Sequence, residues 1–511
     1  MCEKAVSVIR SFQWCLLLRV MFVCALLILG HAGCGGGERA GVAGKDALKD
    51  VFLVENDTQT LKLWSARKVQ VDVLVHIDTS DGMRMFAASS EQDLRNAGEH
   101  LKRGNTAIVD QLAPSLKGGG FVNLGFRAEF FKRVVWVIPS NQPATSQPIE
   151  VFKTFLMTRR GFPESVLKDL RPSGSHIVGT LTGLPITITR LEDMEIGEGE
   201  SIILDIDLAY FVGLRAQDPS YQTGTRSLLK FAEALRGKGL HTRMVTINLC
   251  TQSGLCPMDI RFFGRVMRDA FTKPSYLREP VFEKWSKMMV AEDSLVALRY
   301  EPAIAVYEEL VEKYTRDPGL WFALAVARGF AERGIESRQA LLEAYALDGA
   351  YLNGFFQLAR VLAVGDKIEA GTAVLETPDL TKVIPAVEMD FQRGVFYLNA
   401  KRPYDAITYF NRVAQIRPKD FALQTAIYRA HKLAENEQGM LTTLEKLRRM
   451  DEDRVRRDMP WVYKELGRMY EEATLYKNAM EVYQEYLRLV PGDTSAPDIE
   501  KKVAEWKSYY E

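Results

Sequence analysis

The chain has 511 residues, enough for two or more domains that each bury a core. Lys and Arg total 66, as do Asp and Glu, so the formal net charge is zero, which argues against a protein that binds nucleic acid through bulk charge. A hydrophobic share of 47% with 26% charged residues excludes a mostly disordered chain and one that crosses a membrane many times.

The first 33 residues predict a signal peptide. Basic residues at positions 4, 10 and 19 precede the apolar run 20–29, and small residues follow it. An apolar run of this length is too short to cross about 30 Å of hydrocarbon as a helix. We therefore expect an export signal and not a domain element.

The end of this segment resembles the lipobox of bacterial lipoproteins. Ala32 and Gly33 precede Cys34, although His31 stands where such boxes usually carry leucine. The resemblance implies that Cys34 is lipidated, that residues 34–45 form a glycine-rich tether, and that two or more acyl chains anchor the protein stably. Because Gly35 and not aspartate follows, it also implies the periplasmic face of the outer membrane. An ordinary cleaved signal peptide is the alternative.

Residues 46–274 predict an α/β domain with a largely parallel sheet, because short apolar runs alternate with helical stretches. The expected buried strands are 69–77, 134–138, 201–208 and 243–249. In open α/β sheets ligands bind beyond the carboxyl ends of the strands, so polar residues at those ends are candidate site residues.

Two of these strand ends are acidic. His76 and Asp78 end the first strand, and Asp205 and Asp207 end the third. Alternate residues of a strand point to the same face, so each pair shares a side. Carboxylates with an imidazole suit a divalent metal that activates water, which makes these four the candidate metal ligands. The alternative is structural: the two later aspartates cap a strand-to-helix turn, and His76 is a satisfied histidine near the core.

These motifs resemble an uncharacterised family of the arginase/deacetylase (ureohydrolase) superfamily, in which a His-x-Asp-x-His-x-Asp strand end pairs with a later Asp-x-Asp-x-Asp. Asn123 and Trp136 lie in segments that fit the same family. Ser80, Gly82 and Ala209 stand where the resemblance expects further ligands. It therefore implies either a degenerate, non-catalytic domain without a cofactor, or a metal-dependent hydrolase of an amide or similar bond with an altered site.

Cysteine usage agrees with export, since four of the six cysteines lie within residues 1–34. The other two, Cys250 and Cys256, are separated by a short turn and predict a disulfide in an oxidising compartment. Two independent thiols are the alternative. A zinc site was not expected here, because no second cysteine pair exists.

Residues 275–511 predict an array of about six helical hairpins. A helix-contact position recurs with steps of 34, 34, 35, 34 and 39, and the last step contains an insertion. The positions concerned are Ala291, Ala325, Ala359, Gly394, Tyr428 and Gly467. With aromatic residues and prolines at fixed offsets, the array resembles tetratricopeptide repeats, and residues 504–510 are the expected closing helix.

The tetratricopeptide resemblance implies an all-α solenoid whose concave face binds an extended peptide or another envelope protein. Packing on the neighbouring domain or on other copies of the chain is the alternative. The sequence as a whole predicts a lipid-anchored envelope scaffold that does not bind nucleic acid. The alternative hypothesis is the metal-dependent hydrolase described above.

Overall fold

The computed structural model describes residues 47–79, 91–116, 120–139, 149–160, 162, 164–217, 224–252, 256–490 and 493–510. The predicted signal peptide, Cys34, the tether, Ser80 and Gly82 lie outside these residues. The chain divides into two compact units. Within the described residues, the first unit comprises 47–327 and 340–354, and the second comprises 328–339 and 355–510. No described helix is both long and apolar enough to cross a membrane.

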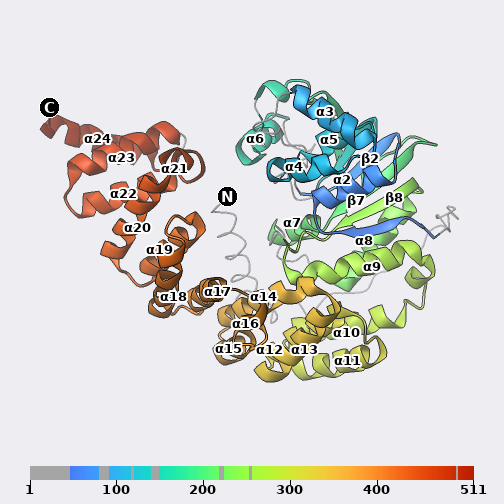
Figure 1. Cartoon of the computed structure of the whole chain (residues 1–511). Coiled ribbons are helices and arrows are strands. Elements are labelled where there is room, and N and C mark those ends of the chain that lie inside the picture. The colour runs from blue at the N-terminus through green and yellow to red at the C-terminus, as the bar shows by residue number, and fades with distance from the viewer. Residues whose placement is uncertain are drawn as a thin grey trace, which may run out of the picture. The chain divides into compact units, whose positions relative to one another are not determined.

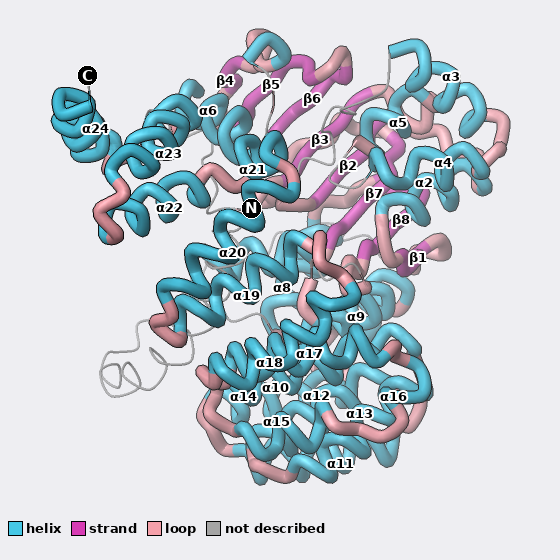
Figure 2. The backbone as a smooth tube through the Cα atoms, turned by 60° about the vertical axis from the view of Figure 1, so that its left-hand side comes forward, coloured by secondary structure: helices cyan, strands magenta, loops and turns pink. Residues whose placement is uncertain are grey.

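The first unit is built on a sheet of eight strands, which lies beside helices such as α2 and α8 (Figure 1). The strand order is β1-β8-β7-β2-β3-β6-β5-β4 (Figure 2). All strand pairs from β1 to β6 in this order are parallel, and only β5 and β4 add antiparallel partners at one edge. The strands are β1 (Val51–Val54), β2 (Val73–Ile77), β3 (Arg133–Val137), β4 (Arg171–Ser173), β5 (His176–Leu181), β6 (Leu184–Thr189), β7 (Ser201–Asp207) and β8 (His241–Asn248). The largely parallel sheet and its four predicted strands are confirmed, whereas β1, β4, β5 and β6 were missed.

Helices cover the sheet, which explains why β2 and β3 are buried along almost their whole length. The helices of the α/β part are α2 (Asp57–Ala66), α3 (Glu91–Lys102), α4 (Ala107–Leu116), α5 (Phe121–Arg127), α6 (Ile149–Arg160), α7 (Ala209–Gln217), α8 (Thr225–Gly237) and α9 (Arg261–Thr272). Helix α2 begins after Asn56, whose side chain accepts a hydrogen bond from the backbone N–H of Gln59.

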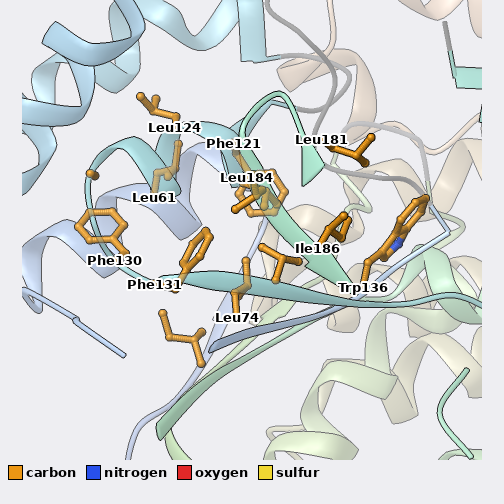
Figure 3. Close-up of a cluster of buried hydrophobic side chains, with 14 of the residues drawn as sticks. Leu61, Leu74, Phe121, Leu124, Phe130, Phe131, Trp136, Leu181, Leu184 and Ile186 are labelled. Atoms are coloured by element: carbon orange, nitrogen blue, oxygen red, sulfur yellow. The ribbon is translucent and has the colours of Figure 1, made fainter. Parts of the chain in front are cut away.

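One hydrophobic cluster fixes helices α2 to α5 on the sheet. Trp64, Phe121 and Phe131 pack against alternate residues of the strands, among them Leu74 and Trp136 (Figure 3). Because residues alternate across a strand, His76 faces the same side as Leu74, and its ring lies 5.5 Å from that of Phe121. The candidate site therefore begins at the margin of this cluster.

Beyond α9 the elements of the described chain are all helices, joined by loops and turns (Figure 2). The helices are α10 (Glu283–Val296), α11 (Tyr300–Lys313), α12 (Pro318–Phe330), α13 (Gly334–Leu347), α14 (Leu352–Val364), α15 (Ile368–Leu375), α16 (Leu380–Val383), α17 (Ala386–Asn399), α18 (Pro403–Ile416), α19 (Phe421–Leu433), α20 (Glu437–Met450), α21 (Glu452–Asp458), α22 (Trp461–Glu472), α23 (Tyr476–Leu489) and α24 (Ala496–Tyr510). The all-α part thus starts near the predicted residue 275, but the first of these helices belong to the same compact unit as the sheet.

The second unit has the helix pairing that the repeat pattern predicts, with α17 on α18, α19 on α20, and α22 on α23. A β-carbon added at Gly394 would lie 2.5 Å from the ring of Phe410, and one at Gly467 would lie 2.3 Å from that of Tyr483. The paired helices therefore approach each other at the predicted glycines, and the chain contains a tetratricopeptide-like helical repeat.

Two departures from the repeat have a visible cause. The pair α19 and α20 carries Tyr428 at the contact position, and its close approach lies instead at Gly439, where a β-carbon would meet His431 at 2.3 Å. The longer last step accommodates the additional short helix α21. The predicted closing helix is confirmed and is longer than expected, because α24 spans Ala496–Tyr510 and places Trp506 against Tyr483.

Replacement of Gly467 by alanine should lower the free energy of unfolding of the second unit by about 1–2 kcal/mol. The new methyl group overlaps the Tyr483 ring, and overpacking of this kind outweighs the gain in helix propensity of about 1 kcal/mol. Gly237→Ala, at the end of α8 in the first unit, is the control for a helical glycine where a β-carbon meets no atom within 4 Å, and it should not destabilise its own unit. Denaturant unfolding followed by circular dichroism measures both, and a stabilised Gly467→Ala variant would contradict the predicted contact.

Glu292 should make the first unit less stable as the pH rises from about 4.5 to about 7. Its carboxylate accepts hydrogen bonds from Thr225 N at 2.9 Å and Thr225 Oγ1 at 2.6 Å, but burial raises its pKa to about 7. Between these pH values the folded protein keeps Glu292 protonated, whereas the unfolded chain has released this proton. The stabilisation linked to the proton is complete below the pKa of Glu292 in the unfolded chain, and it is lost as the pH rises through the pKa in the folded state. Glu292→Gln should remove this part of the pH slope in denaturant titrations, whereas Glu283→Gln, on the same helix, should not reproduce it.

Candidate functional site

The carboxyl ends of β2, β7 and β8 lie side by side and bring three polar residues into register. His76 pairs with Asp205 across β2 and β7, and Asp205 pairs with Thr246 across β7 and β8. His76 Nδ1 lies 2.9 Å from Asp205 Oδ2, and Thr246 Oγ1 donates to Asp205 Oδ1 at 2.5 Å. All three side chains are buried. Both oxygens of Asp205 thus orient neighbouring residues.

Asp78 lies on the other side of the imidazole. Its Oδ2 is 3.7 Å from His76 Nε2, and its backbone carbonyl accepts a hydrogen bond from Trp136 Nε1. Burial lowers the pKa of His76, but the hydrogen bond to Asp205 and the negative charges of Asp205, Asp78 and Asp57 outweigh it and raise the pKa overall. His76 Nε2 itself is buried and has no hydrogen-bond partner within the described chain.

Asp207 lies at the end of β7, where the chain turns into α7. Its Oδ1 accepts a hydrogen bond from the backbone N–H of Ala209, the first residue of that helix, at 2.7 Å. The capping alternative is therefore confirmed for Asp207 and wrong for Asp205, which holds His76 and Thr246 instead. Burial, followed by the charges of Asp78 and Asp57, raises the pKa of Asp207 well above its usual range.

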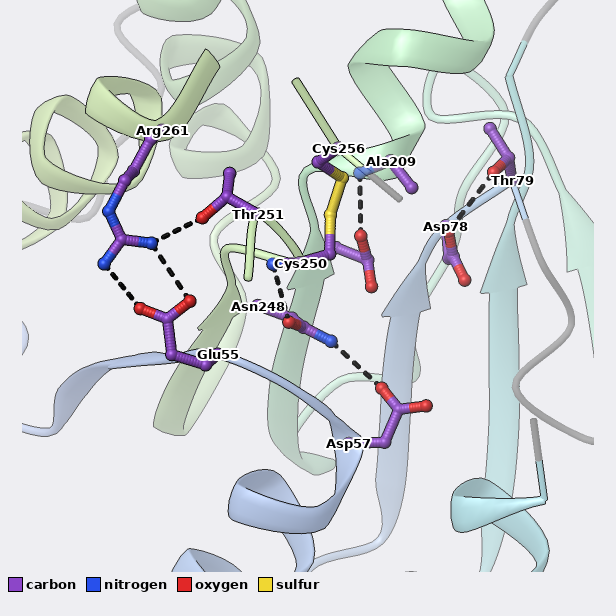
Figure 4. Close-up of a disulfide and its surroundings, with 11 residues drawn as sticks. Glu55, Asp57, Asp78, Thr79, Ala209, Asn248, Cys250, Thr251, Cys256 and Arg261 are labelled. Atoms are coloured by element: carbon purple, nitrogen blue, oxygen red, sulfur yellow. Dashed lines mark hydrogen bonds and ion pairs between the residues drawn. A yellow bond between two sulfur atoms is a disulfide. The ribbon is translucent and has the colours of Figure 1, made fainter. Parts of the chain in front are cut away.

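A fourth carboxylate, Asp57, joins this cluster from the first turn of α2. Its Oδ1 accepts a hydrogen bond from Asn248 Nδ2 at 3.0 Å, and burial together with the charges of Asp205 and Asp78 raises its pKa to about 7 (Figure 4). Sequence reasoning missed it because β1 was not recognised as a strand. The available signal was the short apolar run 51–54 followed by the Asn56 cap.

The two body cysteines form a disulfide beside this edge of the sheet (Figure 4). Their Cα atoms are 5.3 Å apart, and the backbone N–H of Cys250 donates to Asn248 Oδ1. A carboxylate oxygen of Asp207 and both sulfur atoms lie within 4.8 Å of one another. The structure therefore brings the predicted disulfide and the predicted acidic site together, which the sequence did not foresee.

The arrangement concentrates negative charge at the buried carboxyl ends of β2 and β7. The raised pKa values of Asp57 and Asp207 have a common origin in burial and mutual repulsion. Carboxylate oxygens with one imidazole nitrogen are a donor set that fits a divalent cation such as Mn²⁺ or Zn²⁺. Within the described chain, however, the group of such ligand atoms that lie within 4.8 Å of one another is Asp207 with Cys250 and Cys256, so a metal site of His76, Asp78, Asp205 and Asp207 stays a prediction.

No protein-family model matches the sequence, and no curated protein matches it. Among solved structures, the crystal structure of PilW, described as a widely conserved type IV pilus biogenesis factor, aligns with 42% of this chain and 97% of its own, at 12% identity and a TM-score of 0.27. The Cut9–Hcn1 heterotetramer of the APC/C aligns with 58% of this chain and 52% of its own, at 12% identity and a TM-score of 0.24. The chain thus spans about half of the second structure.

Proposed function

We propose that the protein is a membrane-anchored lipoprotein of the bacterial cell envelope that acts as a protein-interaction scaffold through its helical repeat. Cys34 carries the lipid, the acidic site of the sheet is degenerate, and the surface of the repeat binds an envelope protein or an extended peptide. The α/β domain, of arginase/deacetylase-like ancestry, is non-catalytic in this proposal.

The regular helix pairs of the second unit are the observation that carries the proposal. Gly394 and Gly467 are needed for packing within their helix pairs, so residues that could bind a partner must lie on the outer surface of the unit. Tyr404 and Ile416 are among the most exposed large hydrophobic side chains there, at 71% and 67%. Stacked helical hairpins present such residues on a continuous surface, which suits the binding of another polypeptide.

The contacts within the acidic cluster favour a non-catalytic domain. Both oxygens of Asp205 and one of Asp207 are already engaged by neighbouring groups, and Ala209 supplies a methyl group where the resemblance expects an acid. A catalytic metal needs several ligands held for it and an open position for water. The remaining atoms support at most a weakly held cation.

In-cell photo-crosslinking tests the scaffold. A photoreactive residue at Tyr404 or Ile416 should give a discrete crosslinked product with another envelope protein, while the same residue at Val151, exposed on α6 of the α/β part, should not. Crosslinking only to further copies of the chain would replace the proposal by self-assembly, and no product from either site would refute it.

The anchor has its own test. Wild-type protein should incorporate labelled fatty acid and remain in the membrane fraction, and Cys34→Ser should do neither. Equal membrane retention of the two forms, with no lipid on the wild type, would refute lipidation at this residue without affecting the scaffold.

The second candidate is a metal-dependent hydrolase of an amide or similar bond, whose repeats recruit the partner that carries the substrate. It is favoured by His76 Nε2, which is buried near Asp78 without a hydrogen bond, because leaving such a group unpaired costs free energy that a metal would restore. Elemental analysis of the full chain, purified without chelators, separates the candidates. Near-stoichiometric metal that is lost in Asp78→Asn would favour the enzyme, whereas a folded metal-free chain would favour the scaffold.

A further inference from the structure

The sheet topology brings two sulfur atoms to a carboxylate. Strands β7 and β8 are parallel neighbours in which Asp207 pairs with Asn248, and Cys250 follows two residues later. Cys256 returns to the same place just before the 3₁₀ helix Met258–Ile260, and its N–H donates to the carbonyl oxygen of Cys250. The proximity of these three side chains therefore follows from strand register and a backbone hydrogen bond.

The backbone at Cys250 is held in an unusual conformation to achieve this. Its φ of 46° lies in the left-handed region, which a residue with a side chain adopts at a cost. The hydrogen bond from its N–H to Asn248 Oδ1 keeps it there. Asn248 in turn donates to Asp57, so the position of the first sulfur is tied to the residues of the sheet edge.

We propose that the thiol form of the protein binds Zn²⁺ through Cys250, Cys256 and Asp207, and that disulfide formation and metal binding are mutually exclusive states of this site. Two thiolates and a carboxylate are a donor set typical of zinc. Sulfur ligands of a tetrahedral zinc ion lie about 3.8 Å from each other, from a Zn–S bond of about 2.3 Å. Ligand atoms that already lie within 4.8 Å of one another need only small shifts to reach this geometry.

The surroundings suit such an ion. Cys250, Cys256 and the ligand oxygen of Asp207 are all enclosed by protein, which shields a bound ion from bulk solvent. Three protein ligands leave the fourth coordination position of zinc for a water molecule. Ala209 N–H binds Oδ1 of Asp207 and thereby orients the carboxylate, as outer hydrogen bonds do for metal ligands generally. Cysteine spacing in the sequence does not predict this site, because its third ligand is a carboxylate from a different strand.

The conversion between the two states is a thiol–disulfide exchange. A dithiol reductant gives two electrons, the Sγ–Sγ bond breaks, and the reductant becomes its own disulfide. The two new thiols release their protons to solvent when the sulfurs bind Zn²⁺. In the reverse direction a disulfide oxidant takes up the two electrons, with two protons from solvent, and becomes a dithiol, while the Sγ–Sγ bond forms again and the ion is expelled. The zinc-bound form thus belongs to the chain before oxidation or after its reduction.

Cobalt substitution tests the site in the full chain. After reduction and removal of the reductant, Co²⁺ should give a thiolate-to-cobalt charge-transfer band at one ion per chain, and Zn²⁺ should displace it. The oxidised chain should give no such band from these residues. Asp207→Asn should weaken Co²⁺ binding by about tenfold or more, since even outer-shell changes cost 10–100-fold.

The cysteines of residues 1–34 provide the matched control. A variant with all four of them changed to serine should keep the band, and Cys250→Ser/Cys256→Ser, with those four intact, should lose it. Circular dichroism establishes that each variant is folded. As a second readout, Zn²⁺ should raise the melting temperature of the reduced chain and not of the oxidised one.

The proposal is overturned if the band is independent of Cys250 and Cys256, if Asp207→Asn binds as tightly as wild type, or if Zn²⁺ stabilises both redox forms equally. Cobalt held by the acidic residues alone would give no charge-transfer band, so the test is separate from the hydrolase candidate. It is also separate from the scaffold, which depends on the other compact unit.

Discussion

Replacement of Arg261 by alanine should lower the free energy of unfolding of the first unit by about 3–5 kcal/mol, because it leaves the carboxylate of Glu55, whose side chain is 13% exposed, without its cation. The Arg261 side chain is only 7% exposed. Its guanidinium donates to both oxygens of Glu55, at 2.5 and 3.0 Å, and to Thr251 Oγ1 at 2.5 Å (Figure 4). It also donates to Asp348 at 3.0 and 3.1 Å. One side chain thus joins α9, the end of β1, the disulfide loop and the end of α13.

Arg265→Ala is the matched control on the same helix. Its guanidinium lies 3.8 Å from Asp348 and its side chain is 33% exposed, so its loss should cost about 1 kcal/mol or less. Hydrogen exchange of β8 and α9 amides, together with denaturant unfolding, measures both variants. Equal effects of the two substitutions would show that the four-residue network is no more stabilising than a surface ion pair.

A second test distinguishes the uncompensated charges from the lost packing. Adding Glu55→Gln and Asp348→Asn to Arg261→Met removes both carboxylates together with their cation. Stability should then recover in part, because an apolar replacement of a whole buried ion network is tolerated far better than the removal of one member. No recovery would assign the loss to packing of the arginine stem.

Periodicity explains what the sequence could predict. The strands β2, β3, β7 and β8 each contain a cluster of apolar residues, and such clusters indicate strands buried on both faces. His76 and Asp205 were correctly assigned to strand ends, because a parallel sheet collects the ends of its strands on one edge. The repeat could be predicted from its period because the contacts that require Gly394 and Gly467 lie within single hairpins. Residues that are close in sequence make these contacts, so they leave a regular pattern in the sequence.

Long-range pairing explains what the sequence could not predict. Asp57 reaches the site only because β1 pairs with β8, from which it is separated by about two hundred residues of chain. The strands β4, β5 and β6 are the last three strands on one side of the sheet. Each contains polar residues, and β4 and β6 also contain proline, so they lack the apolar signal of the central strands. Arg261 looked like one more charged helical residue, and only the packing of α9 buries it.

The role of Asp205 illustrates the same limit. Its side of the strand followed from the alternation of residues, but its partners depend on the register of two neighbouring strands, which sets His76 and Thr246 opposite it. A carboxylate that orients a histidine through one oxygen and accepts a hydroxyl through the other is a positioning group. Asp205 is therefore not free to act as a cation ligand, in contrast to the set of four ligands that the sequence predicted.

Asp57→Asn should make the first unit more stable at about pH 8, by about 1–3 kcal/mol, although it removes a residue of the candidate site. Burial and the charges of Asp205 and Asp78 raise the pKa of Asp57 to about 7, so its ionised form is disfavoured in the folded state. The stabilisation linked to its proton is complete below the pKa that Asp57 has in the unfolded chain, and it is lost as the pH rises towards 7. Asparagine keeps an oxygen that accepts from Asn248 and carries no charge, so it avoids this loss.

Asp72→Asn is the control with the opposite sign. Its carboxylate accepts hydrogen bonds from Lys132 and from Ser201, and these partners lower its pKa, so its charge stabilises the fold and its loss should destabilise it at neutral pH. Denaturant unfolding at about pH 4.5 and about pH 8 should show Asp57→Asn gaining stability only at the higher pH. Mn²⁺ should stabilise wild type more than Asp57→Asn, because a cation and the loss of the carboxylate relieve the same repulsion. A variant that is less stable than wild type at the higher pH would mean that Asp57 is held by attractive contacts, and the acidic cluster would then have no electrostatic reason to bind a cation.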